Sequence, residues 1–183
     1  AKNAGGAAHQ FFNESMNKNA VRRLQVENQL RHALRNNYLQ VHYQPKVSLR
    51  TQKFVGLEAL VRLELPDVGI VSPAEFIPLA EETGLIIEVG ERVLRQTCRD
   101  MREWVEAGAV QGRVAVNLSA KQFLQPDLTK RIMSILKEEG LNPQYLELEI
   151  TEGVVMDDPE RAIEIMTELN NCGIHLALDD FGT

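Results

Sequence analysis

The sequence has little cysteine, no excess of positive charge and no long hydrophobic run. Its only cysteines among 183 residues are Cys98 and Cys172, and their wide spacing argues against a disulfide framework or a zinc ribbon. The formal net charge of -6 argues against binding to polymeric nucleic acid or to an anionic membrane, since both favour an excess of lysine and arginine. No apolar run approaches the roughly 20 residues that span a bilayer, and no signal-peptide pattern is present. We therefore expect a cytoplasmic segment without direct membrane contact, so that any anchor of the parent protein would lie outside it.

What the sequence does contain is typical of one globular domain with a short appendage. Hydrophobic residues make up 44% of the chain and charged residues 25%, enough apolar material for one sizeable core. Residues 1–19 include small residues and a Gly-Gly pair, and we expect them to be the end of an upstream domain. Residues 20–36 predict an amphipathic linker helix. The apolar stripe expected on this helix consists of Val21, Leu24, Leu30 and Leu34.

After residue 36, predicted strands and helices alternate with regular spacing. Residues 41–49 and 53–63 predict two strands joined by a short polar turn. A capping-box pattern from Ser72 to Glu75 predicts the start of a helix, and Gly84 predicts its end. Helices are then expected over 88–107, 127–139 and 159–171, and strands over 113–119, 145–150 and 174–180. This order predicts parallel βαβ units, and on pattern alone a doubly wound sheet and a (β/α) barrel both remain possible.

Polar side chains share one face of these predicted strands. Side chains alternate across a strand, whereas strands of a buried parallel sheet are usually apolar on both faces. The alternation places on one face, toward the C-terminal strand ends, Glu58, Asn117, Glu149 and Asp179, with Asp180 directly after. Barrel and open-sheet enzymes build their sites at this end of the sheet.

This polar cluster predicts a site for a divalent cation. Unpaired carboxylates in one pocket repel each other, and cations remove that repulsion. Ligand oxygens from Asp, Glu and Asn suit Mg²⁺ or Mn²⁺ rather than zinc. Any one of these acids taken alone is better explained as a cap or a surface charge. Arg62, four residues after Glu58, is a candidate for binding an anionic ligand or a solvent-facing side chain, and Lys46 is expected to be solvated.

An ordered series of motifs runs through residues 37–183. The series consists of YQPKVSL, GLEALVR with Glu58-Ala59-Leu60, SPAEFIPLAEETGLI, VNLSAKQF, LELEITEG and ALDDFGT. Together these motifs resemble the N-terminal part of an EAL domain, the cyclic di-GMP phosphodiesterase family. The resemblance implies a (β/α)8 barrel of the TIM type that hydrolyses cyclic di-GMP to linear pGpG with two Mg²⁺ or Mn²⁺ ions. The expected fold is thus α/β: a linker helix, then about five strands of such a barrel.

The resemblance also implies a role for each matching residue. The implied metal ligands are Glu58, Asn117, Glu149, Asp179 and Asp180. The implied dinucleotide contacts are Gln44, Leu60 and Arg62. Glu58 and Asp179 are expected to be catalytic, together with Glu152, which would order the loop after the fifth strand. Leu63 departs from the family pattern, in which an aromatic residue commonly follows the arginine.

Several expectations concern the parent protein. Residues 1–19 resemble the end of a GGDEF domain, so the parent is expected to be a GGDEF-EAL protein. The chain ends at Thr183, before the sixth-strand lysine that the family uses, so we expect a truncated domain that is inactive alone. The complete domain is predicted to be a cyclic di-GMP phosphodiesterase. The alternative is a catalytically inactive EAL domain acting as a cyclic di-GMP receptor or regulatory interaction module. The resemblance also implies a homodimer.

Overall fold

The computed structural model describes residues 14–179, except residues 152, 154, 155 and 157, with residues 14–19 and 179 described by their backbone alone. The predicted upstream remnant at 1–19 therefore lies outside the described residues, apart from the helical backbone of 14–19. Among the helices of the described segments, none is both long enough and apolar enough to cross a membrane.

Helices and strands alternate along most of the chain. The helices are α1 (Glu14–Asn36), α2 (Pro73–Thr83), α3 (Ile86–Glu106), α4 (Ala120–Phe123), α5 (Leu128–Glu139) and α7 (Pro159–Asn171), with a 3-10 turn η1 (Pro143–Tyr145). The strands are β1 (Leu39–Val47), β2 (Phe54–Leu65), β3 (Gly69–Val71), β4 (Arg113–Leu118), β5 (Leu146–Thr151) and β6 (His175–Asp179). The short elements β3, α4 and η1 were not predicted from the sequence.

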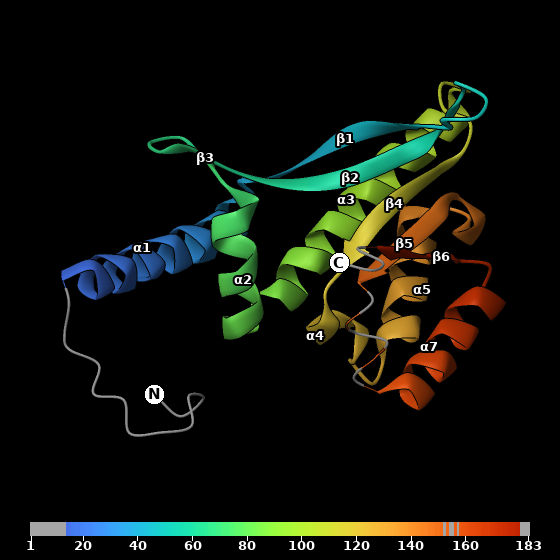
Figure 1. Ribbon diagram of the computed structural model, residues 1–183. Helices are drawn as coiled ribbons and strands as arrows, with labels where there is room; N and C mark the ends of the chain where they lie inside the picture. Colours follow the sequence, from blue (N-terminus) through green and yellow to red (C-terminus); the bar gives the residue numbers. More distant parts are fainter. Residues whose placement is uncertain (1–13, 152, 154–155, 157, 180–183) are drawn as a thin grey trace.

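The strands form one mixed sheet in the order β1-β2-β4-β5-β6, with β3 paired to β2. β1 and β3 run antiparallel to β2. The pairs β2/β4, β4/β5 and β5/β6 are parallel, which confirms the predicted α/β class and its βαβ units. Figure 1 shows α3, α5 and α7 lying along the same side of strands β4 to β6. Closure of this sheet into a barrel stays a prediction.

The core lies between the sheet and these helices. On β5 buried and half-buried residues alternate: Leu146, Leu148 and Ile150 are buried, and the two glutamates between them are only half-buried. α3 contributes Val89, Cys98 and Met101 to the same core. Burying an aliphatic side chain of this size contributes about 1.5–3 kcal/mol. One face of the sheet is therefore fixed by the core, which leaves the other face to its polar side chains.

Helix ends follow the glycine signals more closely than the capping-box signal. Gly84 and Gly140 adopt left-handed backbone angles, φ 78° and 75°, at the ends of α2 and α5, as predicted for Gly84. Ser72 is the N-cap of α2, but its side chain makes no capping hydrogen bond, so the predicted capping box is wrong. A complete capping box occurs instead at α4, between Ser119 and Gln122.

The apolar stripe predicted for the linker helix is only half correct. Leu30 and Leu34 are buried, whereas Val21 and Leu24 are 50% and 61% exposed. In Figure 1 the first half of α1 extends away from the sheet, and the buried residues of this helix, Val26, Leu30, Ala33 and Leu34, lie in its second half. Ion pairs from Arg22 to Glu75 and from Arg23 to Glu82 then join the outer part of α1 to α2.

Candidate active site

The sheet register brings the predicted site residues onto one face. Gln44 of β1 lies opposite Glu58 of β2, and Glu58 is aligned with Ala115 and then Glu147. One step toward the C-terminal strand ends, Asn117 of β4 is aligned with Glu149 of β5 and Ala177 of β6. We call the amide and carboxylate side chains of these rows, together with Lys46, the polar face; its members are Gln44, Lys46, Glu58, Asn117, Glu147 and Glu149. The predicted alternation of side chains is thus confirmed for these strands.

Glu58 and Asn117 contact each other directly. The Asn117 Nδ2 donates a hydrogen bond to the Glu58 Oε1 over 3.0 Å. Asn117 is exposed and Glu58 is half-buried. Two side chains that lie 59 residues apart in the sequence therefore meet on adjacent parallel strands.

Lys46 is not solvated as predicted, because it forms two ion pairs on the polar face. Its Nζ donates to the Glu147 Oε1 over 2.8 Å and to the Glu149 Oε1 over 2.7 Å. The side chains of Lys46, Glu147 and Glu149 are 35%, 20% and 11% exposed. Burial acts to lower the pKa of Lys46, but the hydrogen bonds to both carboxylates outweigh it and raise that pKa above its ordinary value.

The reach of Lys46 shows that the sheet curves toward the polar face. β1 and β5 are separated by β2 and β4, so in a flat sheet they would lie about 14 Å apart at roughly 4.8 Å per step. Side chains standing perpendicular to a flat sheet would not meet across that distance. Gly56, the register partner of Lys46, carries no side chain that could obstruct the crossing, and an added Cβ there would lie 2.4 Å from the Arg113 carbonyl oxygen.

A hollow of about 320 Å³ adjoins the polar face, within the range of about 300–1,000 Å³ that small-molecule sites occupy. Its polar lining includes Arg62, Asn117 and Glu149, and its apolar wall includes Leu60 and Ile77. The predicted ligand contacts Leu60 and Arg62 therefore meet two predicted metal ligands at one cavity. Gln44 and Glu58 do not line this hollow.

Arg62 is half-buried beside this hollow. Its Nη1 donates to the neighbouring Val61 carbonyl oxygen over 2.9 Å. A guanidinium has five N–H donors, so this hydrogen bond leaves capacity for an anionic ligand.

The remaining predicted site residues are described only in part. Asp179 is described by its backbone, which pairs with Thr151 at the end of β5. Glu152 and Asp180 lie outside the described residues. Among the residues whose side chains are described, no group of three or more His, Cys, Asp or Glu forms a candidate metal site. The predicted set differs from such a group because one ligand is an amide, Asn117, and two are aspartates without described side chains.

The donor chemistry nevertheless fits a hard divalent cation. The carboxylates of Glu58 and Glu149 and the amide of Asn117 supply oxygen atoms from three adjacent strands. Mg²⁺ and Mn²⁺ prefer such oxygens. Among the described residues of β4, β5 and β6 there is one histidine, His175, whose register partner on β5 is Glu147. The observed residues therefore match the predicted donor type, and the roles themselves stay predictions.

Two residues of the polar face were missed when the sequence was interpreted. Lys46 was expected to be solvated, and Glu147 was assigned no role. The signal that could have identified them is the same alternation that selected Glu58, because Lys46 shares a face with Gln44, and Glu147 shares one with Glu149.

Comparison with known proteins places this arrangement in a family. The model of the EAL domain matches residues 27–183. The chain belongs to the EAL domain family. Over its 183 residues it is 43% identical to the bifunctional diguanylate cyclase/cyclic di-GMP phosphodiesterase MucR of Pseudomonas aeruginosa. It is also 39% identical over 192 aligned residues to the cyclic di-GMP phosphodiesterase NbdA of the same organism.

Solved structures of EAL domains share the fold. The structure of the PaMucR phosphodiesterase in complex with c-di-GMP matches with a TM-score of 0.83 and 42% identity over 87% of this chain. The FimX EAL domain from Pseudomonas aeruginosa bound to c-di-GMP matches with a TM-score of 0.76 and 28% identity over 86% of this chain. This EAL chain spans 27% of the length of MucR and 24% of NbdA, and 64% and 62% of the two matched structures.

Proposed function

We propose that this chain is the metal- and ligand-binding part of an EAL domain that, when complete, hydrolyses cyclic di-GMP to linear pGpG. The observation that carries the proposal is the convergence of Glu58, Asn117 and Glu149 on the polar face beside a hollow lined by Arg62. The names of MucR and NbdA as cyclic di-GMP phosphodiesterases, and the MucR complex with c-di-GMP, support the same substrate.

In this proposal the chain supplies the ligands of two divalent cations, Mg²⁺ or Mn²⁺. The residues that would hold them are Glu58, Asn117, Glu149, Asp179 and Asp180. Divalent cations at such a centre lower the pKa of a bound water and stabilise negative charge on phosphoryl oxygens. Asn117, through its hydrogen bond to Glu58, orients that carboxylate before any cation arrives.

The other predicted residues would hold the dinucleotide. Arg62 binds a phosphate group through the guanidinium donors that the Val61 carbonyl oxygen does not engage, since arginine pairs well with phosphate oxygens. Leu60 contributes apolar contact from the wall of the hollow. Gln44, exposed and opposite Glu58, orients the ligand from the neighbouring strand. Glu152 would order the loop that follows β6 in the chain.

A second candidate function is binding of cyclic di-GMP without turnover. The observation that favours it is the pair of ion contacts from Lys46, because a positive charge already neutralises Glu149, a predicted metal ligand. A receptor needs the hollow and Arg62 but does not need a cation on Glu149. A regulatory interaction module that has lost ligand binding would need neither.

The proposal extends to features beyond the described residues. The curvature of the sheet supports closure into a TIM-type barrel in the complete domain, which is how barrels remove their sheet edges. We also propose a cytoplasmic homodimer in which α1 links this domain to an upstream GGDEF domain. Sedimentation of the full-length protein would test the dimer.

One assay separates the three functions. The full-length parent protein is incubated with cyclic di-GMP and Mg²⁺ or Mn²⁺, and products are resolved by chromatography while binding is measured in parallel by calorimetry. A phosphodiesterase converts the ligand to pGpG, and metal removal by a chelator stops the conversion. Binding without product would leave the receptor, and the absence of both would leave the interaction module.

A further inference from the structure

The polar face carries more negative charge than positive charge. Its described carboxylates are Glu58, Glu147 and Glu149, and Lys46 is its one described cation. Of these carboxylates, Glu58 and Glu149 are predicted metal ligands, whereas Glu147 has no assigned role. Glu147 nevertheless accepts a hydrogen bond from Lys46 that is almost as short as the one from Lys46 to Glu149, 2.8 Å against 2.7 Å.

Lys46 reaches these carboxylates from a strand that is not adjacent to theirs. β1 and β5 are separated by β2 and β4. The lysine side chain therefore crosses the face and ends between two glutamates on alternate positions of one strand, at 35% exposure. Holding a long side chain in one place costs rotamer entropy, which the two ion pairs of Lys46 with partly buried carboxylates have to offset.

We propose that Lys46 is the internal counter-ion of the metal centre: its ammonium occupies Glu149 when no divalent cation is bound, and Glu147 retains Lys46 when a cation takes Glu149. This inference rests on the proposed metal centre. Lys46 and the divalent cation then compete for the carboxylate of Glu149, and the charge of Glu147 determines how readily Lys46 releases it. Both are positioning residues in this proposal, because both act through the carboxylate of Glu149.

The physical basis is electrostatic competition in a partly buried place. Like charges brought within a few ångströms of one carboxylate repel strongly when water is partly excluded. Without Lys46, three carboxylates on one face would repel one another, so the metal-free protein would be less stable and would bind a divalent cation more tightly. Without the charge of Glu147, Lys46 would depend on Glu149 alone and would yield it less readily.

The first test is a titration with Mn²⁺ alone, in the full-length protein, by the electron paramagnetic resonance signal of free Mn²⁺. Lys46→Met keeps an unbranched side chain, one heavy atom shorter, and removes its charge, and we expect Mn²⁺ to bind about tenfold more tightly, within the usual span of coupling between ligands. The matched control is Lys53→Met, which removes the same charge from an exposed position outside the polar face. Equal affinities in the two variants would overturn the competition.

The second test asks whether Glu147 acts through Lys46. Glu147→Gln should weaken Mn²⁺ binding about tenfold, and this effect should largely disappear in the Lys46→Met background, because a double-mutant cycle isolates the contact between the two residues. An undiminished effect in that background would mean that Glu147 acts by its own charge, which would overturn its proposed role. If Lys46→Met does not fold, as judged by circular dichroism, Glu147→Gln alone decides, and unchanged or tighter binding would overturn the proposal.

Failure of the metal centre itself gives a different result. Wild-type protein that binds no Mn²⁺ would remove the centre and the competition together. Wild-type protein that binds Mn²⁺ with the affinity of all the variants would remove the competition and leave the centre intact.

Discussion

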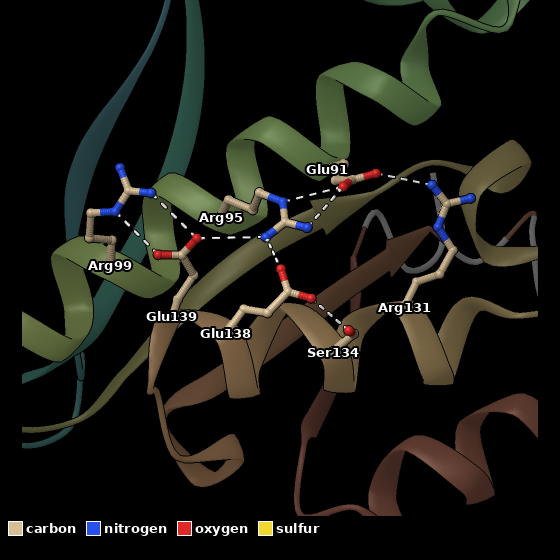
Figure 2. A network of polar contacts seen from close by, with 7 residues as sticks. All are labelled: Glu91, Arg95, Arg99, Arg131, Ser134, Glu138 and Glu139. Atoms are coloured by element: carbon tan, nitrogen blue, oxygen red, sulfur yellow. Dashed lines mark hydrogen bonds and ion pairs between the residues drawn. The ribbon is translucent and has the colours of Figure 1, made fainter.

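Two clusters of charged side chains in this EAL chain differ in their proportion of acidic to basic residues. Figure 2 shows the first cluster, which joins α3 to α5 on the outside of the fold. Its members are Glu91, Arg95, Arg99, Arg131, Ser134, Glu138 and Glu139. Here acids and arginines are equal in number, and each arginine contacts at least one glutamate, as Arg95 contacts Glu138 over 2.6 Å. The positive and negative charges of this helix-to-helix network therefore balance without a ligand.

The charges of the polar face do not balance. It has three described carboxylates and one lysine, Lys46, which contacts only two of them. Glu58 is instead bonded to the neutral amide of Asn117. The comparison teaches that the balance of charges, more than their presence, separates a structural cluster from the proposed cation site.

The largest expected difference between the clusters is in catalysis. Glu58→Gln removes a predicted metal ligand while keeping a hydrogen-bond acceptor for Asn117. Loss of a residue that only supports a metal ligand costs up to about 100-fold in activity. For Glu58→Gln we expect the rate of cyclic di-GMP hydrolysis by the full-length protein to fall by more than that. The initial rate of pGpG formation measures this. Glu64→Gln, an exposed change on the same strand, is the control and should leave the rate near that of the wild type. Full activity in Glu58→Gln would show that the metal assignment is wrong.

In the helix-to-helix network, a charge change should affect stability and not turnover. Arg95→Met removes contacts with Glu91 and Glu138, and exposed networks of this kind contribute modestly, so we expect a loss of about 1 kcal/mol in the free energy of unfolding. Urea unfolding monitored by circular dichroism gives the value. Arg50→Met, at an exposed turn, is the control and should change stability little. If Arg95→Met lost hydrolysis without losing stability, the assignment of this network to stability and not to turnover would be wrong.

The smallest expected effect is a pH dependence carried by Glu91. Burial acts to raise the pKa of Glu91, but hydrogen bonds from Arg131 and Arg95 outweigh it and lower that pKa below its ordinary value. A carboxyl group with a lowered pKa in the folded state stabilises the fold above its unfolded pKa, and that contribution is lost as the pH falls through the folded pKa.

The stability difference between wild type and Glu91→Gln should therefore shrink as urea unfolding is repeated from pH 6 toward pH 3. Glu106→Gln, at the exposed end of α3, should show no comparable trend. A gap between wild type and Glu91→Gln that stays constant with pH would contradict the proposed cause.

Local patterns in the sequence predicted much of this fold. Alternation along β2, β4 and β5 separated the core face from the polar face correctly, because a strand cannot change the side on which a residue lies without shifting its register. Glycine predicted the end of α2 at Gly84, since few other residues adopt its left-handed backbone angles. The bounds of α7, residues 159–171, matched the prediction.

What the sequence did not predict depends on contacts between distant segments. Lys46 meets Glu149, 103 residues further along the chain, only because the sheet curves, and the sequence of a single strand does not predict how the whole sheet curves. The exposure of Val21 and Leu24 depends on where α1 ends its contact with the rest of the chain. Ser72 had the pattern of a capping box, but Glu75 pairs with Arg22 of α1 instead.

The spacing of the polar face finally depends on a residue without any functional group. Gly56 lies at the seam where β2 and β4 begin to run together, and even one methyl group there would press on the Arg113 carbonyl oxygen at 2.4 Å. A side chain at this position would push β2 and β4 apart at their first register pair and move Glu58 away from Asn117. The close approach of the two strands thus requires glycine here, and the contact between Glu58 and Asn117 further along the strands depends on it.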